Sequence, residues 1–136
     1  MAVATVGIIG SGLMGSGIAQ VSAAAGLKVI VRDIDEAALK RGVGAIESSL
    51  ARLVSREKMT EAAKTAALGA ITTTTDIGKL AAADFVIEAA TENLGLKQKI
   101  LKEIEGFVPP TCIVATNTSS VSVTKLAATL AQPGRF

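Results

Sequence analysis

The sequence is poor in aromatic residues and has no histidine. Its 136 residues include no tryptophan, no tyrosine and only three phenylalanines. The aromatic platforms on which single-stranded nucleic acids stack are therefore absent. The hydrophobic share of 49% must then come from valine, isoleucine, leucine and alanine, which suits the buried strands of a parallel sheet.

The chain also has a single cysteine and a small net charge. The single Cys112 excludes an internal disulfide, and its apolar neighbours predict a small core residue in a reducing compartment. The formal net charge is +2, with the basic residues spread along the chain. This balance gives no electrostatic reason to expect nucleic acid or an anionic membrane as a partner.

The stretch from Val3 to Leu27 carries no charge, so it could be mistaken for a signal peptide or a membrane span. It lacks a basic leading region, and six glycines interrupt its apolar residues, which argues against both interpretations. We expect a soluble, cytoplasmic protein with one domain that spans residues 1–136.

A glycine motif near the start of the chain is its most informative feature. The apolar segment Val6 to Ile9 predicts a buried strand, and it leads directly into Gly10, Gly12 and Gly15, spaced as G-x-G-x-x-G before a helix. The first glycine permits a tight turn, the second lets the backbone approach a pyrophosphate, and the third lets the helix pack close to the sheet. The helix N-terminus offers unpaired N–H groups to an anion. The predicted cofactor-binding corner also includes Ser11, Leu13 and Met14.

An acidic residue completes this motif. Asp33 follows the predicted strand Val29 to Arg32, at the distance from the glycines where a ribose-binding carboxylate is expected. A carboxylate there accepts hydrogen bonds from free ribose hydroxyls and repels a 2′-phosphate, which favours NAD over NADP. Arg32 does not change this interpretation, because neighbouring side chains on a strand point to opposite faces. The alternative is an ordinary glycine turn with Asp33 as a helix cap.

The next segments predict helices with identifiable starts and ends. The first helix should place Ile18, Val21 and Ala25 on one face and stop at Gly26. Two N-cap candidates, Asp35 and Thr60, should begin a long helix and a short one that ends at Gly69. These two helices form a hairpin that a plain nucleotide-binding crossover does not need, so we expect it to project from the sheet.

The second half continues the alternation of strands and helices. Strands are predicted at Ile71 to Thr75, Phe85 to Ala89 and Cys112 to Ala115. A helix between the last two should bury a stripe formed by Leu96, Ile100, Ile104 and Phe107. The pattern predicts an α/β fold with a doubly wound, Rossmann-like parallel sheet in the order 3-2-1-4-5, of five to six strands.

With these residues identified, the whole chain resembles the N-terminal domain of the 3-hydroxyacyl-CoA dehydrogenases, of the short-chain bacterial kind that acts on 3-hydroxybutyryl-CoA. The resemblance rests on four motifs in order: GSGLMGSGIAQ with Asp33, SSLARLVSREK from Ser48, VIEAATENLGLKQKI from Val86, and NTSS from Asn117. All four at family-like spacing are a stronger signal than the glycine motif alone.

The resemblance implies roles for particular residues. Gly10 to Gly15 would hold the pyrophosphate and Asp33 the adenosine ribose, while the nicotinamide side would be lined by Glu92, Lys97, Asn117 and Ser119. Ser119 would also hydrogen-bond the substrate oxygen, and coenzyme A would meet Ser49, Arg56, Lys58 and Ser119. Taken without the family, these residues would be interpreted as a helix cap, exposed charges and a solvated helix end.

The resemblance also implies parts that this sequence does not contain. The family's general base is a histidine in a segment that would follow Phe136, and a helical domain would close over the substrate and form a homodimer. We therefore expect a truncated cofactor domain that binds NAD without normal turnover, and whose last strand, as an edge, could pair with a second copy. The alternatives are a non-catalytic NAD-binding or scaffold module, and the cofactor domain of another β-hydroxyacid dehydrogenase, such as a 3-hydroxyisobutyrate or 6-phosphogluconate enzyme.

Overall fold

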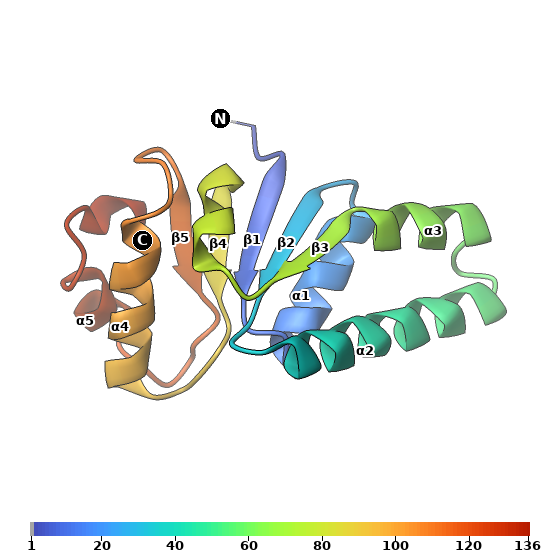
Figure 1. Cartoon of the computed structure of the whole chain (residues 1–136), viewed down its shortest axis with the longest axis horizontal. Helices are drawn as coiled ribbons and strands as arrows, with labels where there is room; N and C mark the ends of the chain where they lie inside the picture. The colour runs from blue at the N-terminus through green and yellow to red at the C-terminus, as the bar shows by residue number, and fades with distance from the viewer. Residues whose placement is uncertain (1) are drawn as a thin grey trace.

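A computed structural model describes residues 2–136 and shows five strands that alternate with helices (Figure 1). The strands are β1 (Thr5–Ile9), β2 (Lys28–Arg32), β3 (Ile71–Thr74), β4 (Phe85–Glu88) and β5 (Ile113–Thr116). The α-helices are α1 (Leu13–Ala24), α2 (Glu36–Ser55), α3 (Glu61–Gly69), α4 (Leu94–Glu105) and α5 (Val123–Ala127), and two 3-10 helices are η1 (Ile77–Ala82) and η2 (Pro133–Arg135). The predicted strand positions agree with these bounds within one or two residues.

The strands form one parallel sheet in the order β3-β2-β1-β4-β5, as predicted. The order reverses between β1 and β4, where Ile9 pairs with Glu88 at the carboxyl ends of both strands. Ligands of open α/β sheets bind in the crevice at such a reversal. The fold therefore places the expected site beside the glycine motif that follows β1.

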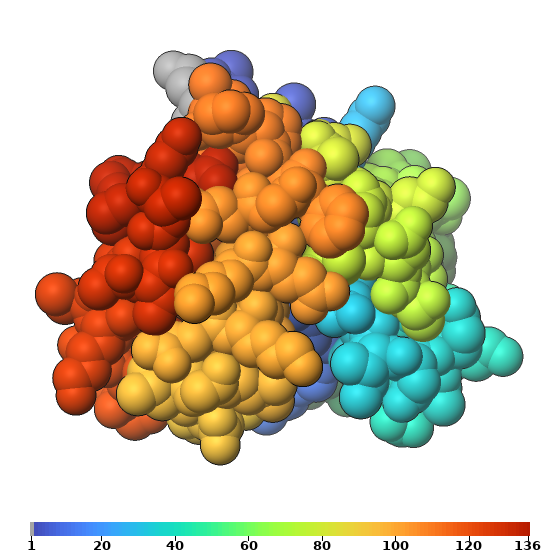
Figure 2. Space-filling view, turned by 60° about the vertical axis from the view of Figure 1, so that its left-hand side comes forward, coloured from blue at the N-terminus to red at the C-terminus, as the bar shows by residue number. Residues whose placement is uncertain are grey.

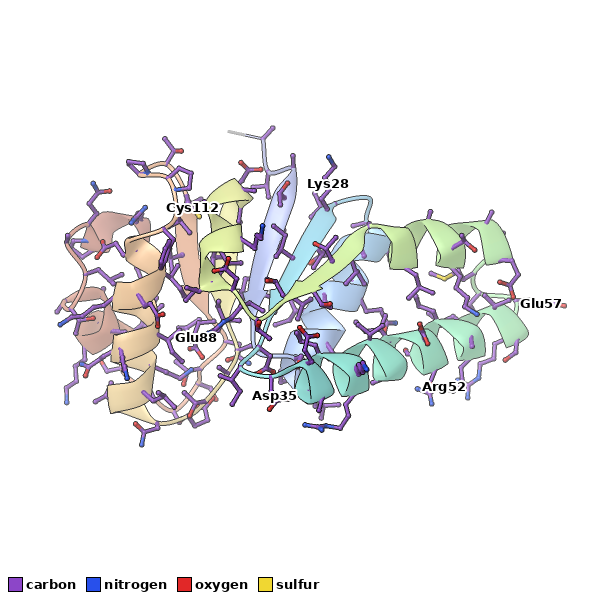
Figure 3. The ribbon with its side chains drawn as sticks, in the orientation of Figure 1. Lys28, Asp35, Arg52, Glu57, Glu88 and Cys112 are labelled. Atoms are coloured by element: carbon purple, nitrogen blue, oxygen red, sulfur yellow. The ribbon has the colours of Figure 1, made fainter. Side chains whose placement is uncertain are left out.

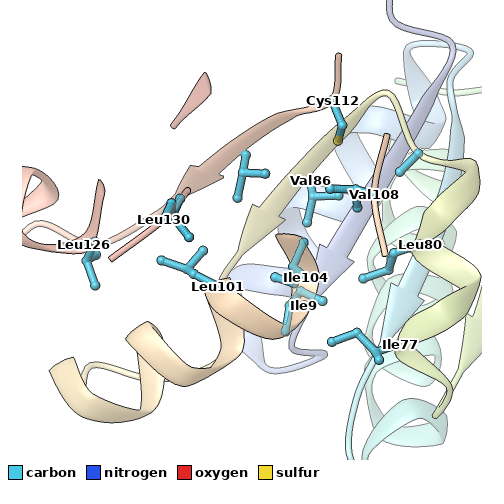
Figure 4. Close-up of a cluster of buried hydrophobic side chains, with 12 residues drawn as sticks. Ile9, Ile77, Leu80, Val86, Leu101, Ile104, Val108, Cys112, Leu126 and Leu130 are labelled. Atoms are coloured by element: carbon cyan, nitrogen blue, oxygen red, sulfur yellow. The ribbon is translucent and has the colours of Figure 1, made fainter. Parts of the chain in front are cut away.

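Helices cover both faces of the sheet, and each face has its own apolar core. One core joins α1, α2 and α3 to the sheet through residues such as Ile8, Val31 and Leu50. The other core joins η1, α4 and α5 to the opposite face, around Val86 and Ile104 (Figure 4). Cys112 is buried in this second core, as predicted, and burial raises the pKa of its thiol above the ordinary value.

The face of α1 that packs on the sheet differs from the predicted one. The buried positions are Gly15, Ser16, Ala19 and Ala23, whereas Val21 is 65% exposed and Ala25 lies beyond the end of the helix. The prediction followed the larger apolar residues, but the helix turns its small residues inward. Small side chains let α1 lie close to the strands, and Gly26 ends the turn with a φ of +93°, as predicted.

The buried face of α4 is also shifted by one residue from the predicted stripe. Lys97, Leu101 and Ile104 are buried, whereas Leu96 is 46% exposed and Phe107, beyond the end of the helix, is 47% exposed. A lysine occupies the position where the apolar pattern required a hydrophobic residue. The prediction of Ile104 is confirmed, and that of Leu96 and Phe107 as buried residues is wrong.

The helical hairpin formed by α2 and α3 extends past the edge of the sheet beyond β3, as expected (Figure 1). Its helices begin at the predicted caps, because Asp35 accepts a hydrogen bond from the Ala38 N–H and Thr60 accepts one from the Ala63 N–H. Across residues 2–136, no helix combines the length and apolar character required to cross a membrane.

Candidate functional site

The loop between β1 and α1 has two positions, Gly10 and Gly15, where any side chain would clash with the backbone. Gly10 has a φ of +102°, and a Cβ there would lie 2.7 Å from the carbonyl oxygen of Ala89. A Cβ on Gly15 would overlap the carbonyl oxygen of Gly10, so only glycine allows α1 to begin this close to the strand. Gly12 faces open space. The loop therefore leaves room for a ligand above a tightly packed corner.

The N-terminus of α1 is also available to an anion. Each of the other four α-helices begins at an N-cap residue whose side chain accepts a hydrogen bond from a backbone N–H; these residues are Asp35, Thr60, Asn93 and Ser122. The N-cap of α1 is Gly12, which provides no such side chain. The first N–H groups of this helix thus point outward without a protein side chain as cap, and a phosphate at this position would accept from them and interact favourably with the helix dipole.

Asp33 lies next to this loop and is already oriented. Its Oδ2 accepts hydrogen bonds from the Ser11 N–H at 2.8 Å and the Ser11 hydroxyl at 2.5 Å, and its Oδ1 accepts one from the Ile34 N–H at 2.7 Å. Partial burial raises the pKa of Asp33, but these hydrogen bonds outweigh it and hold the pKa below its ordinary value. The carboxylate is therefore fixed at the end of β2 with lone pairs still available for hydroxyl groups.

This lowered pKa predicts how stability changes with pH. Because the folded state favours the ionised carboxylate, its contribution is complete above the unfolded pKa and is lost as the pH falls through the lower, folded pKa. We expect Asp33→Asn to lower the urea midpoint at pH 7, and the difference from the wild type to shrink below the ordinary value of 3.8. Urea titrations at pH 7, 5 and 3.5 test this; a difference independent of pH would contradict it.

A cavity of about 730 Å³ opens beside the loop and Asp33. Its wall on the α1 side includes Gly10, Ser11, Gly12 and Leu13, and Ala89 and Ala90 close it at the end of β4. The α2 side contributes side chains that the sequence did not single out, namely Arg41 and Arg52, together with the predicted Ser49. Met14 is exposed and Gly15 is buried beneath the loop, and the residues that line the cavity include neither of them.

The predicted coenzyme A residues do not all lie together. Ser49 lines the cavity, whereas Arg56 is the C-cap of α2 and Lys58 lies in the turn that follows. Both basic side chains are exposed, near the end of α2 that Figure 3 marks with Arg52 and Glu57. They lie at the end of the hairpin, on either side of the exposed Glu57, and not on the wall of the cavity.

The residues predicted for the nicotinamide side lie at the carboxyl ends of β4 and β5. Glu92 accepts hydrogen bonds from the hydroxyls of Thr118 at 2.8 Å and Ser120 at 2.6 Å, which joins the two loops that follow these strands. Those bonds lower the pKa of Glu92. Asn117 and Ser119 stand in the second of these loops, and the cap of α5 is Ser122, so Ser119 is not used as a cap.

Lys97 lies deeper than the sequence predicts. Its side chain is 0% exposed and pairs with Glu88, whose side chain is also 0% exposed. Glu88 ends β4 and lies between that strand and α4 (Figure 3). The sequence analysis missed Glu88, although a carboxylate inside the apolar run from Phe85 to Ala89 is a signal that could have identified it.

The molecular surface agrees with a site on this edge of the sheet. In the view of Figure 2, α4 in yellow to orange and α2 in cyan face each other across a hollow, at the floor of which the blue N-terminal segment is visible. The glycine loop, a fixed carboxylate at the end of β2 and a cavity at the reversal of strand order together define a dinucleotide-binding domain of the Rossmann type.

Comparison with known proteins agrees with the Rossmann class and identifies a family within it. The family model described as "3-hydroxyacyl-CoA dehydrogenase, NAD binding domain" matches residues 5–136, and the chain belongs to this family. This finding favours the predicted family over the other β-hydroxyacid dehydrogenases.

Individual relatives match nearly the whole of this chain. It is 46% identical over 131 residues to a 3-hydroxybutyryl-CoA dehydrogenase of Bradyrhizobium diazoefficiens, covering 96% of this chain and 45% of that protein. It is 43% identical to a 3-hydroxyadipyl-CoA dehydrogenase of Escherichia coli, covering 98% of this chain and 28% of that protein. The crystal structure of an (S)-3-hydroxybutyryl-CoA dehydrogenase from Ralstonia eutropha superposes with a TM-score of 0.97 at 52% identity, over 99% of this chain and 48% of that one. The chain thus spans less than half the length of these relatives.

Proposed function

We propose that this chain binds NAD in the cavity beside the glycine loop, and that it serves a protein that interconverts (S)-3-hydroxyacyl-CoA and 3-ketoacyl-CoA. The observation that carries the first part is the uncapped N-terminus of α1 next to Asp33, on the wall of a cavity of about 730 Å³. A pyrophosphate suits the N–H groups of the helix, and a ribose diol suits the carboxylate. The side chain of Arg32 donates to the Thr75 carbonyl oxygen, on the β3 side, and does not line the cavity, which agrees with a cofactor without a 2′-phosphate.

The chemistry of the reaction assigns the remaining roles. When bound, NAD would supply the acceptor for a hydride from C3 of the hydroxyacyl chain. The hydroxyl of Ser119, an exposed residue in the loop after β5, is proposed to hydrogen-bond the substrate oxygen, with Asn117 in the same loop. A hydrogen bond at that oxygen orients it and stabilises the charge that develops as its proton leaves.

The acyl-CoA class of substrate is supported by the hairpin and by the names of the relatives. Arg56 and Lys58 place two cations near the end of α2, where phosphates of coenzyme A would be attracted, and Ser49 lines the cavity. Relatives are named for 3-hydroxybutyryl-CoA and for 3-hydroxyadipyl-CoA. A four-carbon acyl chain is our proposal, since the relative in the 52% identical structure carries that name.

The resemblance implies a histidine as general base, and the given sequence contains no histidine. We therefore propose that the chain alone binds the cofactor without normal turnover, and that the homodimer implied by the resemblance needs further chain. A scaffold module without a catalytic role would show no oxidation of 3-hydroxybutyryl-CoA even when the histidine-bearing part is supplied.

Asp33→Ala tests the proposed cofactor site. Loss of hydrogen bonds to a carboxylate costs about 1.5–3 kcal/mol, so we expect the affinity for NADH to fall by about 10- to 100-fold. Fluorescence titration of NADH measures this, and circular dichroism shows whether the variant is folded. Glu47→Ala is the matched control, because it removes an exposed carboxylate from α2 outside the cavity. Equal affinity in the wild type and Asp33→Ala would refute the assigned role.

A further inference from the structure

A buried carboxylate connects four segments at the carboxyl edge of the sheet. Glu88 Oε1 pairs with the Lys97 ammonium at 2.5 Å and accepts a hydrogen bond from the Thr116 hydroxyl at 3.0 Å. Its Oε2 accepts one from the Ala90 N–H at 2.7 Å. One side chain thus joins β4 to α4, to β5 and to the loop that contains Ala90.

Thr116 extends this network to the next loop. Its hydroxyl donates to Glu88, so its lone pairs accept from Lys97 at 3.3 Å and from the Thr118 N–H at 3.3 Å. Each donor has an acceptor, and no group can reverse its role without losing a bond. Glu88 therefore fixes the direction of the Ala90 N–H and, through Thr116, helps to hold the turn from Asn117 to Ser120, which Thr118 and Ser120 also tie to Glu92.

The stability of the core does not require this arrangement. A buried ion pair loses its hydration, and apolar residues of the same volume are often as stabilising or more so. Leu101 and Ile104 lie on the same buried face of α4 as Lys97, so the second core already provides apolar contacts there. What apolar residues cannot do is fix the direction of an N–H or a hydroxyl.

The position of the network relative to the cofactor follows from the sheet order, and this step rests on the proposed function. Asp33 lies at the end of β2 and the glycine loop at the end of β1. A dinucleotide with its adenosine over β2 and its pyrophosphate over β1 must extend toward the neighbour of β1 on the other side, which is β4, followed by β5. The nicotinamide half then lies over the two loops that Glu88 holds.

From this geometry we propose that Glu88 is a positioning residue for the nicotinamide half of the cofactor, acting through Ala90, Lys97 and Thr116. It holds the loops after β4 and β5 in the arrangement that binding requires, so less conformational freedom is lost when the cofactor binds. It does not serve the adenosine half, which is held on the other side of the glycine loop. The two halves of NADH should therefore respond differently to changes at Glu88.

The test compares NADH with ADP as ligands of a double variant, Glu88→Leu with Lys97→Met. The double variant removes both charges, so the chain should fold and melt close to the wild-type temperature. We expect its ADP affinity to stay within about twofold of the wild type and its NADH affinity to fall about tenfold or more, as measured by calorimetry. Single substitutions are less informative, because each leaves an unpaired buried charge.

A second variant tests the network without touching the ion pair. Thr116→Val removes the hydroxyl at nearly constant shape, and the loss of its hydrogen bonds should weaken NADH binding by about two- to tenfold while ADP binding is unchanged. Thr73→Val makes the same change at an exposed position of β3 and is the control.

The outcomes separate this inference from the proposed function. Thr116→Val keeps both Glu88 and Lys97, so it separates positioning by Glu88 from a direct contact of Lys97 with the cofactor. If Thr116→Val or the folded double variant binds NADH as the wild type does, or loses ADP and NADH affinity equally, Glu88 is not a positioning residue for the nicotinamide half. A wild-type chain that binds neither ligand overturns the proposed cofactor site, and this inference with it.

Discussion

Gly15→Ala should abolish measurable NADH binding and destabilise the domain. The added Cβ would overlap the carbonyl oxygen of Gly10, so either that carbonyl or the start of α1 must move. Gly10 cannot yield easily, because its N–H donates to the Arg32 carbonyl oxygen at 2.8 Å and its Cα faces the Ala89 backbone. A displacement of about 1 Å at such a site can cost about 100-fold, and forced overpacking costs about 1–3 kcal/mol of stability or more.

A second glycine provides the control for this prediction. A Cβ on Gly44, in the middle of α2, would meet no atom within 4 Å. Gly44→Ala should therefore leave NADH binding unchanged and stabilise the helix by up to about 1 kcal/mol. NADH titration and thermal unfolding of both variants measure the effects. A Gly15→Ala protein that binds NADH within threefold of the wild type would show that this close contact does not shape the site.

The order of the strands could be predicted because each local signal agreed with the global fold. The glycine loop, Asp35 as a helix cap and the β-branched run from Ile71 are short-range features, and each acts in the structure as expected. Sequence alone also predicts that Asp33 lies at the end of a strand near the glycine loop, and the structure has it there, while its contact with a ribose stays a prediction. It does not show that Ser11 already binds this carboxylate through its N–H and hydroxyl, since that requires the folded loop.

The wall of the cavity on α2 could not be predicted, because it depends on how closely two helices approach. A Cβ on Gly42 would lie 2.7 Å from the Ser11 carbonyl oxygen and 2.9 Å from the Ser16 hydroxyl oxygen. The missing side chain lets α2 pack against the glycine loop, and this contact brings Arg41 and Arg52 to the cavity. Nothing in the local sequence distinguishes Gly42 from Gly44, which faces open space.

The buried face of α4 was predicted wrongly for a related reason. Apolar periodicity assumes that charged residues face solvent, but Lys97 is buried because Glu88, on another element, neutralises its charge. With Lys97 assigned to the solvent face, the apolar residues beside it suggested the stripe that contains Leu96. The pairing of two distant residues allows the helix to turn Lys97 inward together with Leu101 and Ile104.

This rotation predicts a large difference between two leucines on the same helix. Leu101 is fully buried in the core shown in Figure 4, so Leu101→Ala should leave a cavity and lower the free energy of unfolding by about 2–5 kcal/mol. Leu96 is 46% exposed, so Leu96→Ala should cost less than about 1 kcal/mol. Urea denaturation of both variants at pH 7 measures the two values. The stripe predicted from apolar periodicity gives the opposite order, and a larger loss at Leu96 than at Leu101 would mean that α4 packs with its other face and that Lys97 is not held by Glu88.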